Sequence, residues 1–125
     1  MTELPTIPDA LAQMRGGALT PTDLVEHCLA RIEPFDEQIR AWVMVDAEGA
    51  LHQAERLTQL ARRGEFVGPL HGIPIGIKDI IDVAGMPTKA GSPLREDVQP
   101  AKQDAPVVAA LRTAGAIILG KTVTT

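Results

Sequence analysis

The sequence predicts an α/β fold in which helices come before the first strands of a mixed sheet. Apolar residues follow helical spacing through most of residues 1–66, which we expect to be mainly helical. Residues 67–125 instead place two aliphatic, strand-like runs, 73–77 and 116–120, on either side of one helix-like segment. Strand, helix and strand in this order form a βαβ unit with parallel strands, so this half is expected to begin an α/β core.

The first two helices are predicted from the signals at their ends. Residues 6–17 form a short amphipathic segment that ends in two glycines. Thr20 suits the cap of a second helix, with Pro21 at its first position and Asp23 near its positive end. Pro34 is expected to end this second helix.

One short strand and two further helices are expected after it. Residues 42–45 are apolar and favour a strand, and Asp46 is expected to open a third helix that stops at Gly64. In the second half, Asp104 is expected to cap the helix of the βαβ unit and Gly115 to end it.

The predicted sheet is too small to stand alone. A parallel sheet is normally covered on both faces, and two or three strands do not complete such an arrangement. We therefore interpret residues 1–125 as the N-terminal part of a single larger domain, whose remainder is absent from this chain. Unpaired strand edges also favour self-association of the fragment, as a homodimer or in larger species.

Composition argues against several classes of partner. The formal net charge is −4 and the basic residues gather nowhere beyond Arg62 and Arg63, so nucleic acid is not an expected partner. Cys28 is the only cysteine, and His27 and His52 have no partner at ligand spacing, so we expect no disulfide, metal or cofactor. The sequence has no recognisable signal peptide or membrane-spanning run, which favours a cytoplasmic protein without a membrane partner.

A phosphate-binding pattern occurs at residues 115–122, which read GAIILGKT. That chemistry needs a strand before the first glycine, a loop whose amides face phosphate, and a helix after the lysine. Here a helix-like segment precedes Gly115, and the residues between the glycines are themselves strand-like. We therefore favour a strand exit, with Lys121 at its end, over a nucleotide site.

A lysine ends the apolar run GIPIGIKDIID at residues 72–82. In a strand the three isoleucines before it point into the core, while Pro74, Gly76 and Lys78 share the other face. Two residues with little side chain leave room beside Lys78 for another group to approach. From the pattern alone, an edge strand protected by a lysine is the favoured interpretation.

Two blocks of the sequence resemble the amidase signature family. Residues 68–92, GPLHGIPIGIKDIIDVAGMPTKAGS, are similar to its N-terminal block, and residues 104–122, DAPVVAALRTAGAIILGKT, to the next. The resemblance extends over residues 20–125. It implies the opening of an α/β/α fold with a mixed sheet, in a hydrolase that cleaves carboxylic amides by a Ser-cisSer-Lys mechanism.

The resemblance implies that Lys78 is the catalytic lysine. An amine is a general base only when it is unprotonated, and burial favours the neutral form. Asp79, the next residue, has two possible interpretations. It orients Lys78 or its loop through backbone contacts, or it caps the turn that follows. His71 is interpreted as a hydrogen-bonded structural residue.

The family's two catalytic serines lie beyond the GKT stretch. Ser92 is the only serine in this chain and matches a position that is not catalytic in the family. Lys89 and Val123 stand where many members have threonine and asparagine. The fragment alone is therefore expected to be inactive, and a small-molecule amide is expected as the substrate of the complete enzyme.

Two alternatives remain open. The chain is also compatible with a segment of the A subunit of a glutamyl-tRNA amidotransferase, which uses the same lysine but passes ammonia to a partner active site. A truncated, non-catalytic module is the other alternative, because the chain lacks the serines.

Overall fold

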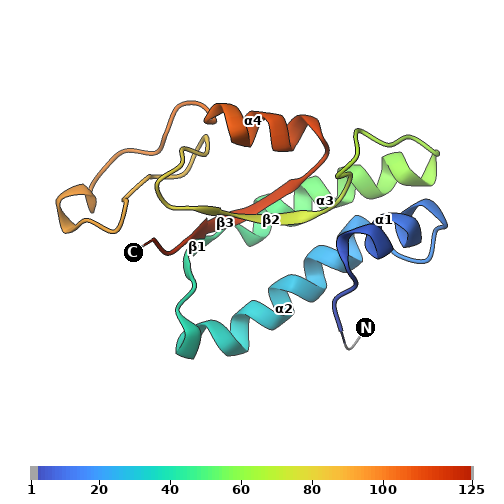
Figure 1. Cartoon of the computed structure of the whole chain (residues 1–125), viewed down its shortest axis with the longest axis horizontal. Coiled ribbons are helices and arrows are strands. Elements are labelled where there is room, and N and C mark those ends of the chain that lie inside the picture. Colours follow the sequence, from blue (N-terminus) through green and yellow to red (C-terminus); the bar gives the residue numbers. More distant parts are fainter. Residues whose placement is uncertain (1–2, 125) are drawn as a thin grey trace.

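A computed structural model describes residues 3–124 as a three-stranded mixed sheet with helices on both faces (Figure 1). The sequence prediction of an α/β fold is therefore confirmed. In chain order the elements are α1 (Ile7–Arg15), α2 (Pro21–Ile39), β1 (Trp42–Val45), α3 (Ala47–Arg62), β2 (Pro74–Lys78), the 3-10 helix η1 (Pro93–Arg95), α4 (Pro106–Thr113) and β3 (Ile117–Thr122).

The strand order in the sheet is β1-β3-β2, so the last strand in the sequence lies in the centre. β3 pairs antiparallel with β1 and parallel with β2. α4 lies on the connection between β2 and β3, which confirms the predicted βαβ unit. The carboxyl ends of the two parallel strands meet at Lys78 and Thr122, which are register partners.

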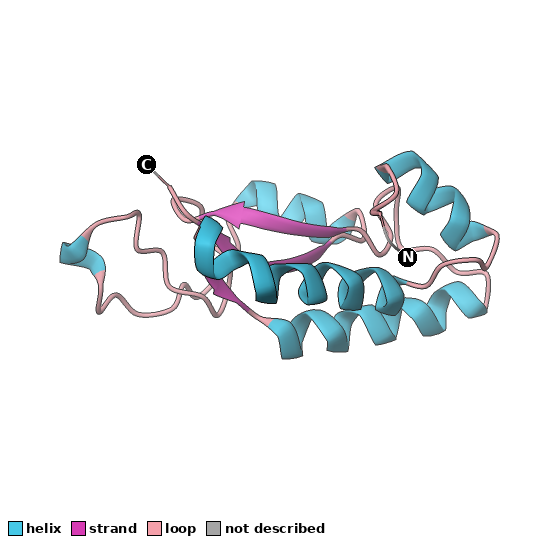
Figure 2. Cartoon of the chain, turned by 90° about the horizontal axis from the view of Figure 1, so that it is seen from below, coloured by secondary structure: helices cyan, strands magenta, loops and turns pink. Residues whose placement is uncertain are grey.

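Helices cover the two faces of the sheet unequally. α2 and α3 lie side by side on one face, and α4 lies on the other (Figures 1 and 2). The core on the α2/α3 face is made by Val25, Ala50, Ala54, Leu57, Ile117 and Leu119. The core on the α4 face is made by Ile77, Val83, Met86, Val108 and Ile118.

α1 packs at the end of the sheet where β2 begins. A third cluster joins it to α2 and to the residue before β2, and it comprises Ala10, Met14, Leu19, Leu24 and Ile73. Of the three isoleucines expected to point one way, Ile73 and Ile77 are buried but in different clusters, and Ile75 packs against both. The isoleucines therefore connect two parts of the core.

The start of α2 is as predicted, but its end is not. Thr20 and Asp23 form a capping box. The Thr20 hydroxyl accepts the Asp23 amide at 3.0 Å, and the Asp23 carboxylate accepts the Thr20 amide at 3.2 Å. Pro34 was expected to end the helix, and this was wrong, because α2 continues to Ile39. A proline removes one helical hydrogen bond, and the exposed position of Pro34 leaves its ring in solvent.

The predicted capping role of Asp104 is also wrong. Ala105 is the N-cap of α4, and it has no side-chain capping bond. The Asp104 carboxylate instead accepts the Ala84 amide at 2.8 Å and pairs with Arg112 Nε at 2.8 Å. Asp104 therefore ties α4 to the segment that follows β2.

The long connection between β2 and α4 projects from one end of the molecule (Figure 2). It contains η1 and is joined to itself by a bridge between Ala84 and Ala101. Within residues 3–124, no helix is long and apolar enough to cross a membrane.

Candidate functional site

Lys78 is the last residue of β2, at the edge of the sheet where β3 also ends. The space expected beside it is partly filled, because a β-carbon added to Gly76 would lie 2.8 Å from Cη2 of Trp42 and 2.9 Å from Cγ2 of Thr122. β1 therefore supplies an indole ring to the face that Gly76 leaves open. Gly76 itself stays exposed, as does Lys78 at the strand end.

The Lys78 side chain is exposed rather than buried. Within the described chain it takes part in no ion pair, whereas the other lysine at this strand end is paired. Its backbone is fixed, since the Lys78 carbonyl accepts the Ile81 amide at 3.0 Å. Residues 3–124 thus hold the backbone of Lys78 firmly and leave its amine in solvent.

Asp79 is buried directly beneath this strand end, with 1% of its surface exposed. Its amide donates to the Thr122 carbonyl at 2.9 Å, and its own carbonyl accepts the Ala90 amide at 2.9 Å. Its carboxylate accepts the Lys89 amide, at 3.3 Å to each oxygen. The interpretation of Asp79 as a residue that organises its loop through backbone contacts is therefore confirmed.

The sequence analysis missed the main partner of Asp79, which is Lys121. Lys121 is fully buried, and its Nζ lies 2.9 Å from Asp79 Oδ1. The same ammonium donates to Thr88 Oγ1 at 3.1 Å and to the Pro87 carbonyl at 3.3 Å. Three acceptors match the three N–H groups of a lysine ammonium, so this charge is completely coordinated.

A bulge in β3 brings Lys121 to the same face as Asp79. Ile117 and Leu119 belong to the α2/α3 core, and strict alternation would put Lys121 on that face too. The pairing with β2 shifts register between Ile75 and Gly76, so that one extra residue is accommodated in β3. Beyond the shift Lys121 pairs with Ile77 and reaches Asp79.

The phosphate-binding interpretation fails in the structure for the reason expected. Residues 117–122 are β3, so the amides between the two glycines belong to a sheet and not to a phosphate loop. Gly115 has φ +99°, and a β-carbon there would lie 2.7 Å from Cα of His71. The backbone conformation and the close packing against His71 therefore explain why a glycine occupies this position. The lysine of the motif is the buried partner of Asp79.

A cavity of about 350 Å³ lies beside Asp79 and is lined in part by the projecting connection. It is lined by Val43, Asp79, Lys89, Gly91, Ser92, Pro93 and Glu96. Ser92 Oγ accepts the Leu94 amide at 3.3 Å and so caps η1. This contact gives the only serine of the chain a local structural task.

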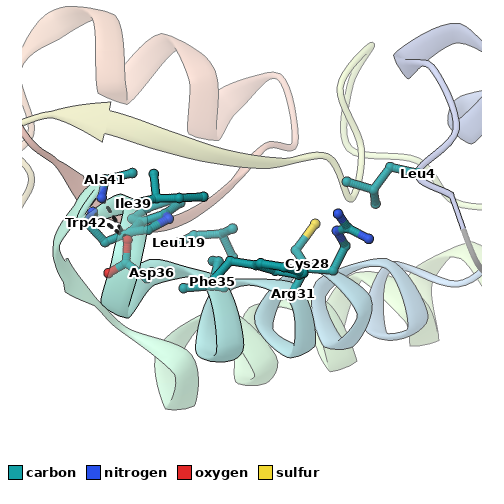
Figure 3. Close-up of a pocket in the computed structure, with 10 residues that line it drawn as sticks. Leu4, Cys28, Arg31, Phe35, Asp36, Ile39, Ala41, Trp42 and Leu119 are labelled. Atoms are coloured by element: carbon teal, nitrogen blue, oxygen red, sulfur yellow. Dashed lines mark hydrogen bonds between the residues drawn. The ribbon is translucent and has the colours of Figure 1, made fainter.

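A larger, apolar cavity of about 400 Å³ lies between α2 and the α2/α3 face of the sheet (Figure 3). Most of its lining is apolar, and it comprises Leu4, Cys28, Arg31, Ile32, Phe35, Asp36, Ile39, Ala41, Trp42 and Leu119. Burial raises the pKa of the Cys28 thiol, so this cysteine is not an activated nucleophile. The Asp36 carboxylate is already used, because it accepts the amides of Ala41 and Trp42 at 2.7 and 3.2 Å.

His71 is structural, as interpreted from the sequence. It is 1% exposed, and its Nδ1 accepts the Val67 amide at 2.9 Å. An accepting Nδ1 places the proton on Nε2, which then donates to the Leu57 carbonyl at 2.9 Å. Both ring nitrogens are therefore used in joining the segment before β2 to α3.

Comparison with known proteins identifies the family. A family model described as Amidase matches residues 23–125, which is most of the chain. The chain therefore belongs to the amidase family, as its two sequence blocks predicted.

Similar proteins have different names. The A subunit of glutamyl-tRNA(Gln) amidotransferase from Streptomyces coelicolor is 43% identical over 117 residues, which cover 94% of this chain and 23% of that protein. AmiD of Mycobacterium tuberculosis is 43% identical over 108 residues, which cover 86% of this chain and 22% of that protein.

Solved structures show the same relationship. The peptide amidase of Stenotrophomonas maltophilia matches with a TM-score of 0.85 and 39% identity, over 93% of this chain and 24% of that one. An inhibitor-bound complex described as revealing the origins of an s-triazine catabolic enzyme matches with a TM-score of 0.92 and 30% identity, over 97% and 26%. The chain thus spans about a quarter of the length of these relatives.

Proposed function

We propose that residues 1–125 are the N-terminal part of a single amidase domain that hydrolyses carboxylic amides. Family membership supports this proposal, and one observation supports the site: Lys78 stands at the common carboxyl end of two parallel strands. In open α/β sheets, ligands bind beyond the carboxyl ends of the strands. We accordingly assign the catalytic lysine to Lys78, and residues 1–66 and 67–125 to the helical and α/β parts of this domain.

In the proposed reaction Lys78 is the general base of a Ser-cisSer-Lys triad. Its neutral amine accepts a proton from the bridging serine, which in turn accepts the proton of the nucleophilic serine. The nucleophilic Oγ attacks the amide carbon, the C–N bond breaks as the leaving amine is protonated, and water then hydrolyses the acyl-enzyme. A small-molecule amide is the substrate in this scheme.

The two serines of this triad must come from outside the chain. Ser92 is the only serine and is occupied as the cap of η1. The exposed position of Lys78 agrees with a site that is completed by further polypeptide. Such polypeptide would bury the amine and so favour its neutral form. The fragment alone is therefore inactive in this proposal. A reducing cytoplasm suits its single free thiol.

A second candidate function is a segment of the A subunit of a glutamyl-tRNA amidotransferase. The Streptomyces coelicolor relative, at 43% identity, has that name. The two functions differ in the fate of the released ammonia, which the hydrolase releases and the amidotransferase passes to a partner. Co-purification with two further subunits, together with glutamine-dependent amidation, would favour the second function.

The deciding experiment uses the complete protein that contains this chain. Hydrolysis of 4-nitroacetanilide and of glutamine is measured for wild type and Lys78→Ala, with folding checked by circular dichroism. General-base catalysis contributes about 10²- to 10⁴-fold, so a folded Lys78→Ala variant should lose at least about a hundredfold in rate. Wild-type activity in that variant would refute the assignment of Lys78.

A further inference from the structure

The pair formed by Asp79 and Lys121 is unusual in its burial. Lys121 is 0% exposed and Asp79 is 1% exposed, and their charged atoms are 2.9 Å apart. Both charges have lost their hydration, and replacing such a pair by apolar residues of similar volume is often neutral or stabilising. Stability alone is therefore a weak explanation for placing two charges here.

The pair is also the centre of a polar network. Thr88 Oγ1 accepts an N–H of Lys121 and donates its own proton to Asp82 Oδ1 at 2.7 Å. Lys121 lies on β3, Asp79 follows β2, and Pro87 and Thr88 belong to the projecting connection. One ammonium thus joins β3 to the residue after β2 and to the projecting connection, both of which are distant from β3 in the sequence.

The network adjoins the backbone of Lys78 through Asp79, the next residue. The peptide unit between Lys78 and Asp79 has both polar atoms bonded, its carbonyl to the Ile81 amide at 3.0 Å and its N–H to the Thr122 carbonyl at 2.9 Å. The Asp79 side chain, held by Lys121, is the third constraint on this unit. The backbone position of Lys78, which sets where its side chain begins, is therefore fixed by three interactions.

We propose that Asp79 and Lys121 are positioning residues for Lys78, a role that rests on the proposed function above. A general base must come within about 2.6–3.2 Å of the proton that it removes. A long, exposed lysine side chain reaches such a point reproducibly only from a fixed backbone, and a misplacement of about 1 Å can lower a rate about 10²-fold. The β3 bulge, which turns Lys121 toward Asp79, is part of this arrangement.

The test compares stability with serine reactivity in the complete protein. The variants are Asp79→Asn, Lys121→Met and the double variant, and the readouts are the Tm and the rate of serine labelling by a fluorophosphonate probe. Each single variant leaves a buried charge unpaired and should lower both the Tm and the labelling rate. The double variant removes both charges, so its Tm should return toward wild type while labelling stays at least about tenfold slow.

The double variant separates positioning from a purely structural role. Labelling at the wild-type rate in a folded double variant would overturn the proposal. Thr88→Val is a milder variant that removes one acceptor of Lys121, and it covers the case in which the others fail to fold. We expect Thr88→Val to fold and to label more slowly than wild type, and an unchanged rate would count against positioning.

Two controls distinguish this proposal from the one on which it rests. Arg112→Gln breaks a different ion pair, the one that Arg112 makes with Asp104 on α4, and should leave the labelling rate within about twofold of wild type. Lys78→Ala should abolish labelling. If Lys78→Ala labels normally, or if wild type does not label at all, the proposed function itself fails. If only the pair variants label normally, the positioning role fails alone.

Discussion

The indole ring of Trp42 lies directly over Gly76, so that a β-carbon at position 76 would come within 2.8 Å of the ring. We expect Gly76→Ala to destabilise the fold by about 1–3 kcal/mol, because the ring or β2 must shift to admit the methyl group. Chemical denaturation measures this difference. Gly16→Ala is the matched control, since its nearest neighbour is at 3.5 Å and its φ is −82°. Equal effects of the two substitutions would contradict the packing argument.

Substitution of Lys78 by arginine tests general-base chemistry. Arginine keeps the length and the positive charge of lysine but does not deprotonate near neutral pH. In the complete protein, Lys78→Arg should therefore be nearly as inactive as Lys78→Ala, with a loss of about 10²- to 10⁴-fold in kcat/KM. An electrostatic or structural lysine would behave differently. Retention of more than about a tenth of the activity by folded Lys78→Arg would show that this residue is not the base.

The isolated 125-residue chain should self-associate. The apolar cavity beside α2 opens next to Phe35 and Ile39, which are 48% and 67% exposed, and the outer edges of β1 and β2 are unpaired in the described sheet. Light scattering should detect oligomers, and Ile39→Lys should reduce them. A monomeric wild type with a sharp, cooperative unfolding transition would instead favour an independent module.

The Cys28 thiol should react slowly with iodoacetamide. Burial raises the pKa of the Cys28 thiol, so a smaller fraction is thiolate at neutral pH than in an exposed cysteine. The alkylation rate of the native chain should stay below that of the urea-unfolded chain. At pH values where the unfolded thiol is fully ionised and its rate no longer changes, the rate of the native chain should still increase with pH. Because Cys28 is the only cysteine, the signal belongs to one site. Faster alkylation in the native state would contradict this prediction.

Loss of the His71 ring should be costly. Both of its nitrogens bond to backbone groups, those of Val67 and Leu57, at 2.9 Å each. His71→Ala leaves these groups without a partner and should lower the free energy of unfolding by about 2–4 kcal/mol. His52→Ala, at an exposed site on α3, is the control and should have little effect. Similar losses in the two variants would argue against the hydrogen bonds as the cause.

Local signals in the sequence were sufficient for most of the fold. The capping box of Thr20 and Asp23 and the cap at Asp46 involve residues only three positions apart, so their physics is contained in a short segment. The βαβ unit followed from two aliphatic runs separated by a helix. Pro34 was misjudged because one missing hydrogen bond at an exposed position is outweighed by the rest of α2.

The pair between Asp79 and Lys121 could not be predicted in the same way. Strict alternation along β3 places Lys121 on the wrong face, and only the register of pairing with β2 corrects this. A bulge depends on how two distant strands meet, which a single sequence does not specify. The exposure of Lys78, in contrast, agrees with the edge-strand interpretation of the pattern, because β2 lies at an edge of the described sheet.

The central place of β3 has a consequence for synthesis on the ribosome. β1 is made early, yet its partner in the sheet is β3, which pairs Trp42 with Thr122. The helices α2 and α3 can form and pack on each other once both have emerged, because they are neighbours in the sequence with only β1 between them. β1 and β2 must wait without a partner until β3 emerges between them. During that interval β1 and β2 are unpaired and can form incorrect contacts with other strands. A chaperone that binds the nascent chain would therefore help this part of the protein to fold.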